Sequence, residues 1–598
     1  RYMKLLEVIP TADTDPGITQ FVSDFAETRL GKSVVLCKDT PNFIANRLAS
    51  MGGAVLMDFV LARDYTIEEV DAIVGPLIGR PKTAAFRLQD LVGLDVSSSV
   101  ASNLYGLIPD DESREVLASP SVEALRKSQM DRGRLGDKTK QGFYKKDGKT
   151  IQTLDLKTGE YRERQEPDIP SLAEAAKIRE LPKRVQFVLQ QDDKAGALAR
   201  HVIYHSLGYA ARRVPEISDD IASIDRAVRW GFSHDLGPFE LWDALGVQKT
   251  ANAMEEYGVA VPAWVREKQS FYDRVEAAIA PAIRENPSAS LRDLGDGVLQ
   301  FEIHTKMNTL DEGVREMLEA SVDELERGDW KGMVIGNDGE QFSVGANLRI
   351  LNPDSIGTRV RNMQDAFMRV RFATKPIVAA PFGRTLAGGC ELALSAARIV
   401  AAGETYMGLV EVGVGLIPGA GGCKELIRRV VSPAMKHTPN ADSLPHVQNV
   451  LQTIGMAKVS SSAAEARELG YLAESDRIVM NRDHLLREAK QEVLELAANG
   501  YVPPARETSC YAAGRDVRAA LKAGIYVLRQ GGYISEFDAF VTGKLAHILS
   551  GGELSHAEWV DEQYFLDLER EVFVELAAHP KTQERITYML ETGKALRN

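Results

Sequence analysis

The sequence is poor in cysteine, in positive charge and in long hydrophobic runs. Its four cysteines are widely separated, without metal-ligand spacing, which favours reduced thiols in a cytoplasmic protein over a disulfide framework: Cys37, Cys390, Cys423 and Cys510. The net charge of -13 argues against a general nucleic-acid-binding surface, which needs clustered Lys and Arg. No segment approaches the ~18 apolar residues of a membrane span, and no signal peptide opens the chain.

Histidine and the glycine-rich dinucleotide motif are also scarce. The first of the ten histidines is His201, and no GxGxxG follows a strand-like run, so we expect no NAD site in this chain. His201 and His205 share one helical face but have no third ligand nearby in the sequence. We therefore expect packing rather than metal binding from this pair.

What is present is enough apolar sequence for several large cores. With 598 residues, 44% of them hydrophobic and 26% charged, the chain should form three to five globular domains. It opens on Arg1 and runs directly into the strand-like segment "RYMKLLEVIP". We interpret this as a fragment whose start lies upstream.

The first half reads as helical. A short strand at residues 33–37 and a turn at Pro41 precede a long apolar-periodic helix. Two later segments, from Asp71 and from Asp225, share a spaced Phe, Leu, Asp and Gly, which predicts an internal duplication: Phe86, Leu88, Asp90 and Gly93 in the first, Phe239, Leu241, Asp243 and Gly246 in the second.

The second half changes in texture near residues 285–297. Gly-rich turns there separate strand candidates such as "VLQFEIH", "KGMVIGN" and "KPIVAAPF" from amphipathic helices, which predicts an α/β domain. From about residue 481 the pattern is helical with charged outer faces, which predicts an all-α tail.

Two glycine-rich turns in the α/β region favour an oxyanion site. "FSVGANL" places Ala346 in a turn, and "AGGCELAL" places Gly388 just before a helix, so two backbone N–H groups can converge on one oxygen. Glu391 follows in the first turn of that helix, where a carboxylate by itself usually stabilises the helix dipole. Glu411 lies twenty residues later in a mostly apolar setting, and two such carboxylates predict a general acid and a general base.

These motifs, with "GLVEVGVGLIPGAGG", resemble the enoyl-CoA hydratase (crotonase) superfamily over about residues 290–480. The resemblance implies that Ala346 and Gly388 form the oxyanion hole for a CoA thioester. It further implies that Glu391 and Glu411 flank a catalytic water, which Gly419 helps to hold. Lys306 in "HTKMNTL" is a candidate CoA contact, although a lysine there is as often solvated.

Two positions depart from the hydratase pattern. Asn347 stands where Asp is more usual, and Ala387 replaces a common Gly before the Gly pair. Neither change removes a catalytic group, though each could reshape the acyl pocket.

"RYMKLLEVI", "GKSVVLCKDTPNFIANRL" and the duplicated unit resemble 3-hydroxyacyl-CoA dehydrogenase from its last Rossmann strands onward. Glu7 and Asn46 match the family's base-orienting Glu and substrate-contacting Asn, whereas the catalytic His has no counterpart here. Without the resemblance, Glu7 would be interpreted as a carboxylate at a strand edge and Asn46 as a cap at the start of a helix. Asn42 replaces the usual Gly after Pro41, which is tolerable because Asn accepts left-handed turns.

The whole order resembles a fused 3-hydroxyacyl-CoA dehydrogenase/enoyl-CoA hydratase of fatty-acid β-oxidation that lacks most of its Rossmann domain. We therefore expect a crotonase-type α/β spiral domain, duplicated all-α dehydrogenase C-terminal domains and an α-helical tail. The expected bounds are residues 1–32 for a Rossmann remnant, 33–185 for helical copy 1 with a linker, 186–288 for copy 2, 289–480 for the hydratase and 481–598 for the tail.

The resemblance implies hydration of a 2-trans-enoyl-CoA here, followed in the complete protein by NAD-dependent oxidation. We expect this chain to retain hydration alone, to form a homo-oligomer, and to work with a thiolase partner. The rival hypotheses are another crotonase reaction, such as isomerisation or hydrolysis, and a non-catalytic scaffold. The pair Glu391 and Glu411 favours hydration, because the rivals need not keep both carboxylates.

Overall fold

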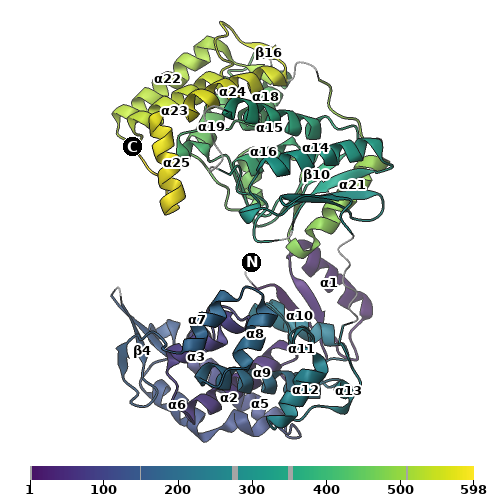
Figure 1. Ribbon diagram of the computed structural model, residues 1–598, viewed down its shortest axis with the longest axis vertical. Coiled ribbons are helices and arrows are strands. Elements are labelled where there is room, and N and C mark those ends of the chain that lie inside the picture. Colours follow the sequence, from purple (N-terminus) through teal and green to yellow (C-terminus); the bar gives the residue numbers. More distant parts are fainter. Residues whose placement is uncertain are drawn as a thin grey trace. The chain divides into compact units, whose positions relative to one another are not determined.

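The computed structural model describes residues 3–148, 150–272, 281–337, 339–347, 355–438, 440–506 and 510–598. It divides into two compact units, Arg1–Glu276 and Ala277–Asn598 (Figure 1). Unit 2 begins twelve residues before the expected boundary at residues 288 and 289. The reason is that strand β6 (Arg284–Glu285) pairs antiparallel with β7 (Ala289–Asp293) and so joins the sheet of unit 2.

Unit 1 opens with two parallel strands and continues mainly as helices. Strand β1 (Leu5–Val8) pairs with β2 (Ser33–Leu36) across α1 (Pro16–Arg29), and the long helix expected after Pro41 is α2 (Ala45–Leu61). The later helices are α3 (Ile67–Val74), α4 (Phe86–Val92), α5 (Leu94–Leu107), α6 (Pro120–Asp131), α7 (Pro170–Lys177), α8 (Leu181–Leu189), α9 (Lys194–Arg212), α10 (Ile221–Phe232), α11 (Pro238–Leu245), α12 (Val247–Glu256) and α13 (Ala263–Arg266). A three-stranded antiparallel sheet occupies the polar stretch between the two similar segments, as β3 (Tyr144–Asp147), β4 (Thr150–Leu154) and β5 (Tyr161–Glu163).

The two similar segments make matching hydrogen bonds. Asp71 accepts from the backbone N–H of Phe86 at 2.9 Å and from the hydroxyl of Tyr144 at 2.7 Å. Asp225 accepts from the N–H of Phe239 at 2.8 Å and from the hydroxyl of Tyr272. In both segments, an aspartate thus holds the start of the next helix.

The next aspartate of each segment repeats the correspondence. Asp90 accepts from the N–H groups of Phe143 and Tyr144, at 2.7 and 2.8 Å. Asp243 accepts from the N–H of Phe271 at 2.8 Å and from that of Tyr272 at 3.3 Å. Each contact joins the helix to a Phe–Tyr pair further along the chain.

Unit 2 is built on a seven-stranded sheet in the order β14-β12-β10-β9-β8-β7-β6. The strands expected at "VLQFEIH", "KGMVIGN" and "KPIVAAPF" are β8 (Val298–Ile303), β9 (Gly332–Ile335) and β10 (Ile377–Ala379), and they run parallel. The sheet is completed by β12 (Arg398–Ala402) and β14 (Arg477–Val479), while β11 (Gly383–Leu386) and β13 (Thr405–Gly408) form a separate parallel pair. This second pair leads directly into the turns that carry the expected catalytic groups.

Helices cover the strands of unit 2. They are α14 (Glu312–Arg327), α15 (Ile356–Arg371), α16 (Gly388–Ser395), α17 (Gly422–Leu426), α18 (Ser432–His437), α19 (Leu444–Gly455), α20 (Ala463–Glu468) and α21 (Leu485–Ala498). Helix α14 starts at Asp311, whose carboxylate accepts from the N–H of Val314 at 2.9 Å and satisfies a donor of the first turn. Helix α21 packs against β9, β10 and β12, so the first helix after residue 481 belongs to the α/β layers.

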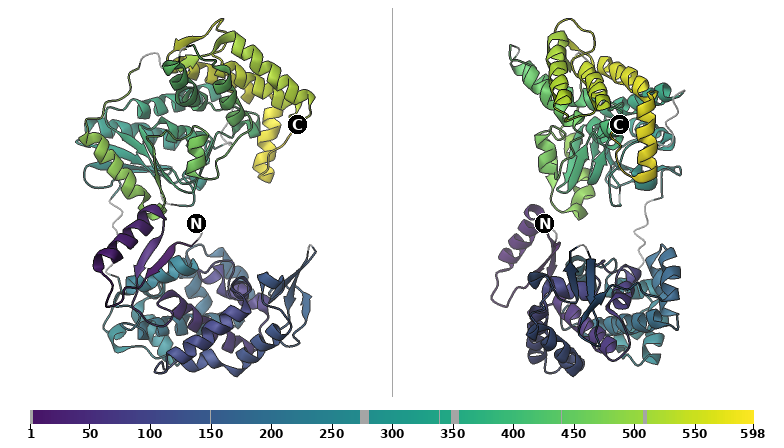
Figure 2. Two further views of the ribbon diagram at one scale, coloured as in Figure 1. Left: turned by 180° about the vertical axis from the view of Figure 1, so that it is seen from behind. Right: turned by 90° about the vertical axis from the view of Figure 1, so that its left-hand side faces the viewer.

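The rest of the tail is mostly but not wholly helical. Figure 2 shows, in yellow-green to yellow, α22 (Gly514–Gln530), α23 (Glu536–Leu549), α24 (Glu562–Ala577) and α25 (Pro580–Thr592). The expectation of an all-α tail is wrong in one detail, because β15 (Cys510–Ala512) pairs antiparallel with β16 (Glu558–Val560). Strands of three residues are too short to show the alternation by which a strand is recognised. Among the described residues, no helix has the length and apolar character needed to cross a membrane.

Candidate active site

Glu391 lies in the first turn of α16 with its side chain buried, only 4% exposed. Its Oε1 accepts hydrogen bonds from the N–H of Ala420 at 2.8 Å and from that of Gly422 at 2.9 Å. Burial raises the pKa of Glu391 to about 7, against the lowering effect of these two donors. A carboxyl with such a pKa can exchange a proton near neutral pH.

Glu411 begins the short helix η6 (Glu411–Val414), which follows β13. Its Oε2 is buried and has no hydrogen-bond partner among the described residues. Burial and the charge of Glu391 raise the pKa of Glu411 well above its ordinary value. The fold thus brings the two carboxyls close enough to interact electrostatically.

The segments of Ala346 and Gly388 lie against one another. A Cβ added at Gly388 would lie 3.6 Å from the backbone nitrogen of Ala346, and Ala346 is held by a bridge to Leu310. Neither amide N–H donates a hydrogen bond to the described residues. Two amides without a partner among the described residues thus lie on adjoining segments.

The backbone around these amides is tightly constrained. Ala387, which stands where a glycine is common, has φ 51°, a conformation that favours glycine. A Cβ added at Gly389 would lie 2.6 Å from Cβ of Ser343, so only glycine fits there. The turn before α16 is strained, as turns at functional sites often are.

Gly419 and Lys306 occupy different surroundings. A Cβ added at Gly419 would lie 2.6 Å from the ring of Phe573 on α24. The carbonyl of Gly419 accepts a hydrogen bond from Nε2 of Gln364 at 2.7 Å. Lys306 is exposed in the short helix η4 (Lys306–Asn308), four residues before Leu310. Gly419 therefore lies at a close contact with the tail, whereas Lys306 lies on the surface.

A third buried carboxyl was not anticipated from the sequence. Glu569 of α24 is 0% exposed, and it accepts from the N–H of Gly421 at 2.8 Å and from the N–H of Lys424 at 2.7 Å. Burial and the charge of Glu391 raise the pKa of Glu569 to about 8. The carboxyl groups of Glu391 and Glu569 therefore accept hydrogen bonds from interleaved N–H groups of residues 420–424, where α17 begins.

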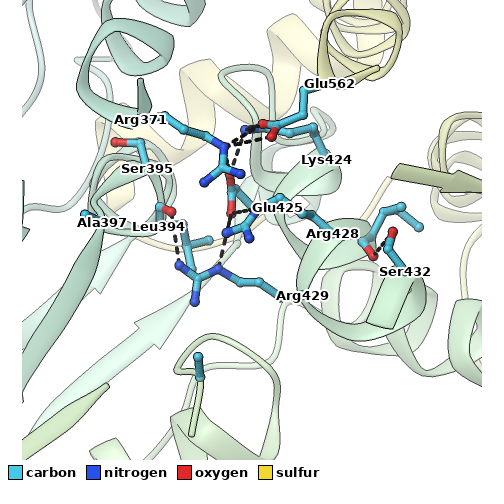
Figure 3. A network of polar contacts seen from close by, with 12 residues as sticks. Arg371, Leu394, Ser395, Ala397, Lys424, Glu425, Arg428, Arg429, Ser432 and Glu562 are labelled. Carbon is cyan, nitrogen blue, oxygen red and sulfur yellow. Dashed lines mark hydrogen bonds and ion pairs between the residues drawn. The ribbon is translucent and has the colours of Figure 1, made fainter. Parts of the chain in front are cut away.

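A buried charged network fixes this segment further (Figure 3). Nζ of Lys424 donates to Glu425 at 2.6 Å and to Glu562 of α24 at 2.9 Å. Arg371 of α15 donates to Glu562 at 2.8 Å, and Arg428 donates to Glu425 at 2.6 Å. The surrounding cations hold the pKa of Glu425 well below its usual range. Helices α15, α17 and α24 are thus tied together beside Glu391.

In unit 1 the structure gives Glu7 a structural contact. Its Oε1 accepts from the N–H groups of Ile44 and Ala45, at 3.1 and 3.0 Å, so Glu7 caps the start of α2. Asn46 is exposed in the first turn of α2, and both residues line a cavity of about 1340 Å³. Asn42 has φ 62°, the left-handed turn expected for it.

His201 and His205 pack against aromatic rings. The ring of Phe59 stacks on His201 at 4.1 Å between centroids, and the two imidazoles lie 4.4 Å apart. Burial lowers the pKa of His201 to about 4. Within the described part of the chain, no group of three His, Cys, Asp or Glu side chains could hold a metal ion.

Comparison with known proteins finds two families in this order. Residues 43–146 match the model of the 3-hydroxyacyl-CoA dehydrogenase C-terminal domain, and residues 294–495 match that of enoyl-CoA hydratase/isomerase. Solved enoyl-CoA hydratases from Bacillus halodurans and Bacillus anthracis align with 50% and 52% of this chain and with 99% and 97% of their own. Their identities are 16% and 19%, and their TM-scores 0.34 and 0.30.

Two relatives match over nearly the whole chain. A probable 3-hydroxyacyl-CoA dehydrogenase of Bacillus subtilis is 42% identical over 637 residues, covering 100% of this chain and 79% of the relative. A putative fatty acid oxidation complex trifunctional enzyme of Rickettsia felis is 28% identical, covering 98% of this chain and 78% of the relative. The chain therefore belongs to the 3-hydroxyacyl-CoA dehydrogenase family of fatty-acid oxidation enzymes, in the form that also carries an enoyl-CoA hydratase/isomerase region.

Proposed function

We propose that unit 2 hydrates 2-trans-enoyl-CoA to 3-hydroxyacyl-CoA. The observation that carries the proposal is a pair of buried, interacting carboxyls, Glu391 and Glu411, on elements that adjoin the facing Ala346 and Gly388 segments. In this mechanism Glu391, as carboxylate, removes a proton from the water that attacks Cβ, and Glu411 delivers a proton to Cα. The two amides stabilise the thioester oxygen while it carries the enolate charge.

The other residues have supporting roles in this proposal. Gly419 helps to hold the water, and Lys306 of η4 contacts the CoA moiety from the surface. Isomerisation and hydrolysis remain rival reactions of the same oxyanion hole, and neither requires both carboxyls. The requirement of hydration for both Glu391 and Glu411 is therefore the feature to test.

Replacing Glu391 or Glu411 by Gln keeps the side-chain volume but removes proton exchange. We expect kcat for crotonyl-CoA hydration to fall by about 10² to 10⁴-fold in each variant, with a much smaller change in substrate affinity. Because both groups act on one water, the double variant should lose far less than the product of the single losses. The wild-type rate should rise with pH through about 7, as Glu391 ionises.

The matched control is Glu468→Gln, which changes an exposed glutamate of the same unit. It should hydrate crotonyl-CoA at the wild-type rate. If either site variant kept near wild-type kcat, that glutamate would be a structural residue, and the isomerase or scaffold hypothesis would be favoured.

For unit 1 we propose a duplicated dehydrogenase C-terminal region, with copies at residues 33–185 and from residue 186 to the end of the unit at Glu276. Glu7 of β1 and Asn46 of α2 contribute to an acyl-CoA site in this proposal. The matching contacts of Asp71 and Asp225 support the duplication. In this proposal the region takes part in NAD-dependent oxidation of a 3-hydroxyacyl-CoA, which also needs a histidine base and a dinucleotide site.

No histidine precedes His201 to act as the dehydrogenase base. We expect the purified chain to hydrate crotonyl-CoA. In a separate assay with 3-hydroxybutyryl-CoA and NAD, we expect it to form no NADH. The measurement is NADH absorbance, with a complete dehydrogenase as the positive control. Appreciable NADH formation would contradict the expected loss of this activity.

A further inference from the structure

The cavity of unit 1 is lined mainly by apolar side chains, with several basic residues among them. Its lining includes Leu48 and Ala49 of α2, Val96 and Val100 of α5, and the loop residues Arg80 and His234. An apolar cavity with a few polar groups at one place is the usual form of a small-molecule site. Arg80 and His234 are among the basic lining residues that the proposed function does not use.

Arg80 and His234 occupy equivalent places in the two similar segments. Each lies nine residues after the matching aspartate, Asp71 or Asp225. Each also follows a residue in the left-handed conformation, Gly79 with φ 78° and Ser233 with φ 55°.

The two loops are joined directly. The N–H of Asp235 donates to the carbonyl of Gly79 at 2.8 Å, which places His234 beside Arg80. Burial, together with the charge of Arg80, lowers the pKa of His234 to about 3. The internal repeat thus brings two basic side chains together at one place in the cavity lining.

Arg80 lacks a counter-charge in the described part of the chain, where no carboxylate forms an ion pair or hydrogen bond with its guanidinium. Burial lowers its pKa to about 10. By contrast, Arg87, seven residues later, is paired with Asp137 at 2.5 Å. Arg80 is partly exposed and lines the cavity, so an anion there can approach a guanidinium that no described carboxylate occupies.

We propose that Arg80 and His234 form an anion subsite that binds an oxyanion group of an acyl-CoA ligand in the cavity of unit 1. This inference rests on the proposed role of unit 1 as an acyl-CoA site. The guanidinium suits phosphate and carboxylate oxygens, which it can bind through two parallel N–H groups. The apolar wall of α2 and α5 suits the uncharged part of the same ligand.

The oxyanion has two sources in such ligands. One is the phosphate of the CoA carrier, and the other is a carboxylate at the far end of the acyl chain. Coenzyme A alone carries only the first, and a pantetheine monothioester of a dicarboxylic acid carries only the second. Comparing these two compounds therefore identifies the source.

The test follows the His234 imidazole by NMR in the whole chain, with ¹³C-labelled histidine and the signal assigned through His234→Gln. Binding of coenzyme A or of the dicarboxylic thioester at Arg80 should shift this signal. Arg80→Met should weaken the apparent affinity for that compound about 10- to 100-fold, the usual effect of losing a charged hydrogen bond. Arg80→Lys should restore part of it. Lys82→Met is the matched control, since it removes an exposed charge two residues away in the same loop.

Each outcome bears on the inference. A shift with coenzyme A supports a phosphate source, and a shift only with the dicarboxylic thioester supports a carboxylate source. No shift with either compound, an unchanged affinity in Arg80→Met with native thermal unfolding, or equal affinities for inorganic phosphate and coenzyme A would overturn the assignment. Crotonyl-CoA hydration reports unit 2 separately, so failure of the hydratase proposal leaves the His234 result interpretable.

Discussion

At the scale of single residues, the candidate active site depends on carboxyls that resist ionisation. Glu391 and Glu569 have pKa values raised to about 7 and about 8, chiefly by burial. At a pH between the pKa values of these groups in the unfolded chain and their pKa values in the folded protein, the folded protein binds more protons than the unfolded chain. The stability of unit 2 should therefore be highest near pH 5 and fall as the pH rises to about 8.

Replacing Glu569 by Gln tests this directly. Glu569 contributes full stability below its unfolded pKa of about 4.5 and loses it as the pH rises through its folded pKa of about 8. The loss should amount to a few kcal/mol, with a slope of about 1.4 kcal/mol per pH unit for one proton. Gln cannot ionise but can accept only one of the two N–H bonds, so Glu569→Gln should be less stable than wild type at pH 5 and should lose less stability than wild type between pH 5 and pH 8.

The measurement is the free energy of unfolding of unit 2 by urea at several pH values. Glu571→Gln is the control, because it alters an exposed glutamate two residues along α24 and should follow the wild-type curve. Parallel curves for wild type and Glu569→Gln would show that Glu569 ionises in the folded protein as it does in the unfolded chain.

At the scale of elements, the sequence correctly predicts those helices and strands that follow from a local residue pattern. The apolar runs at β8, β9 and β10 have strand length and composition, and α14 has clear helical periodicity, so these elements lie where they were expected. The glycine-rich turn before α16 likewise predicted the place of Glu391. In each case the information lies within about twenty neighbouring residues.

The role of α24 could not be predicted in this way. Glu569 contacts Gly421, 148 residues earlier in the chain, and no local rule pairs positions that far apart. One indication was available, since Glu569 lies between Phe565 and Phe573 at helical spacing, on the apolar face of α24. A charged residue on such a face must find a partner, and the partner here is the segment that also binds Glu391.

At the scale of the whole molecule, each unit has its own core. One large apolar cluster draws only on residues of unit 2, from Ala289 to Ile586, while the main cluster of unit 1 runs from Val35 to Val265. A compact region with a separate core can unfold cooperatively by itself. We therefore expect two thermal transitions in calorimetry.

Phe86→Ala should distinguish these transitions. Phe86 is fully buried and contacts Phe143 edge-on, with 4.7 Å between ring centroids. Its truncation should cost about 3 to 5 kcal/mol, which lowers the Tm of unit 1 by on the order of 10 °C. The second transition and crotonyl-CoA hydration at a temperature below both should stay unchanged.

The reciprocal variant is Phe301→Ala, which removes a fully buried ring from β8 in unit 2. It should lower the other Tm and leave the transition affected by Phe86→Ala in place. A single transition that moves as a whole in both variants would show that the two cores unfold together. In that case the loss of stability in one unit would reach the other, and substitutions in the cavity of unit 1 would have to be compared at equal stability before their effects on ligand binding were interpreted.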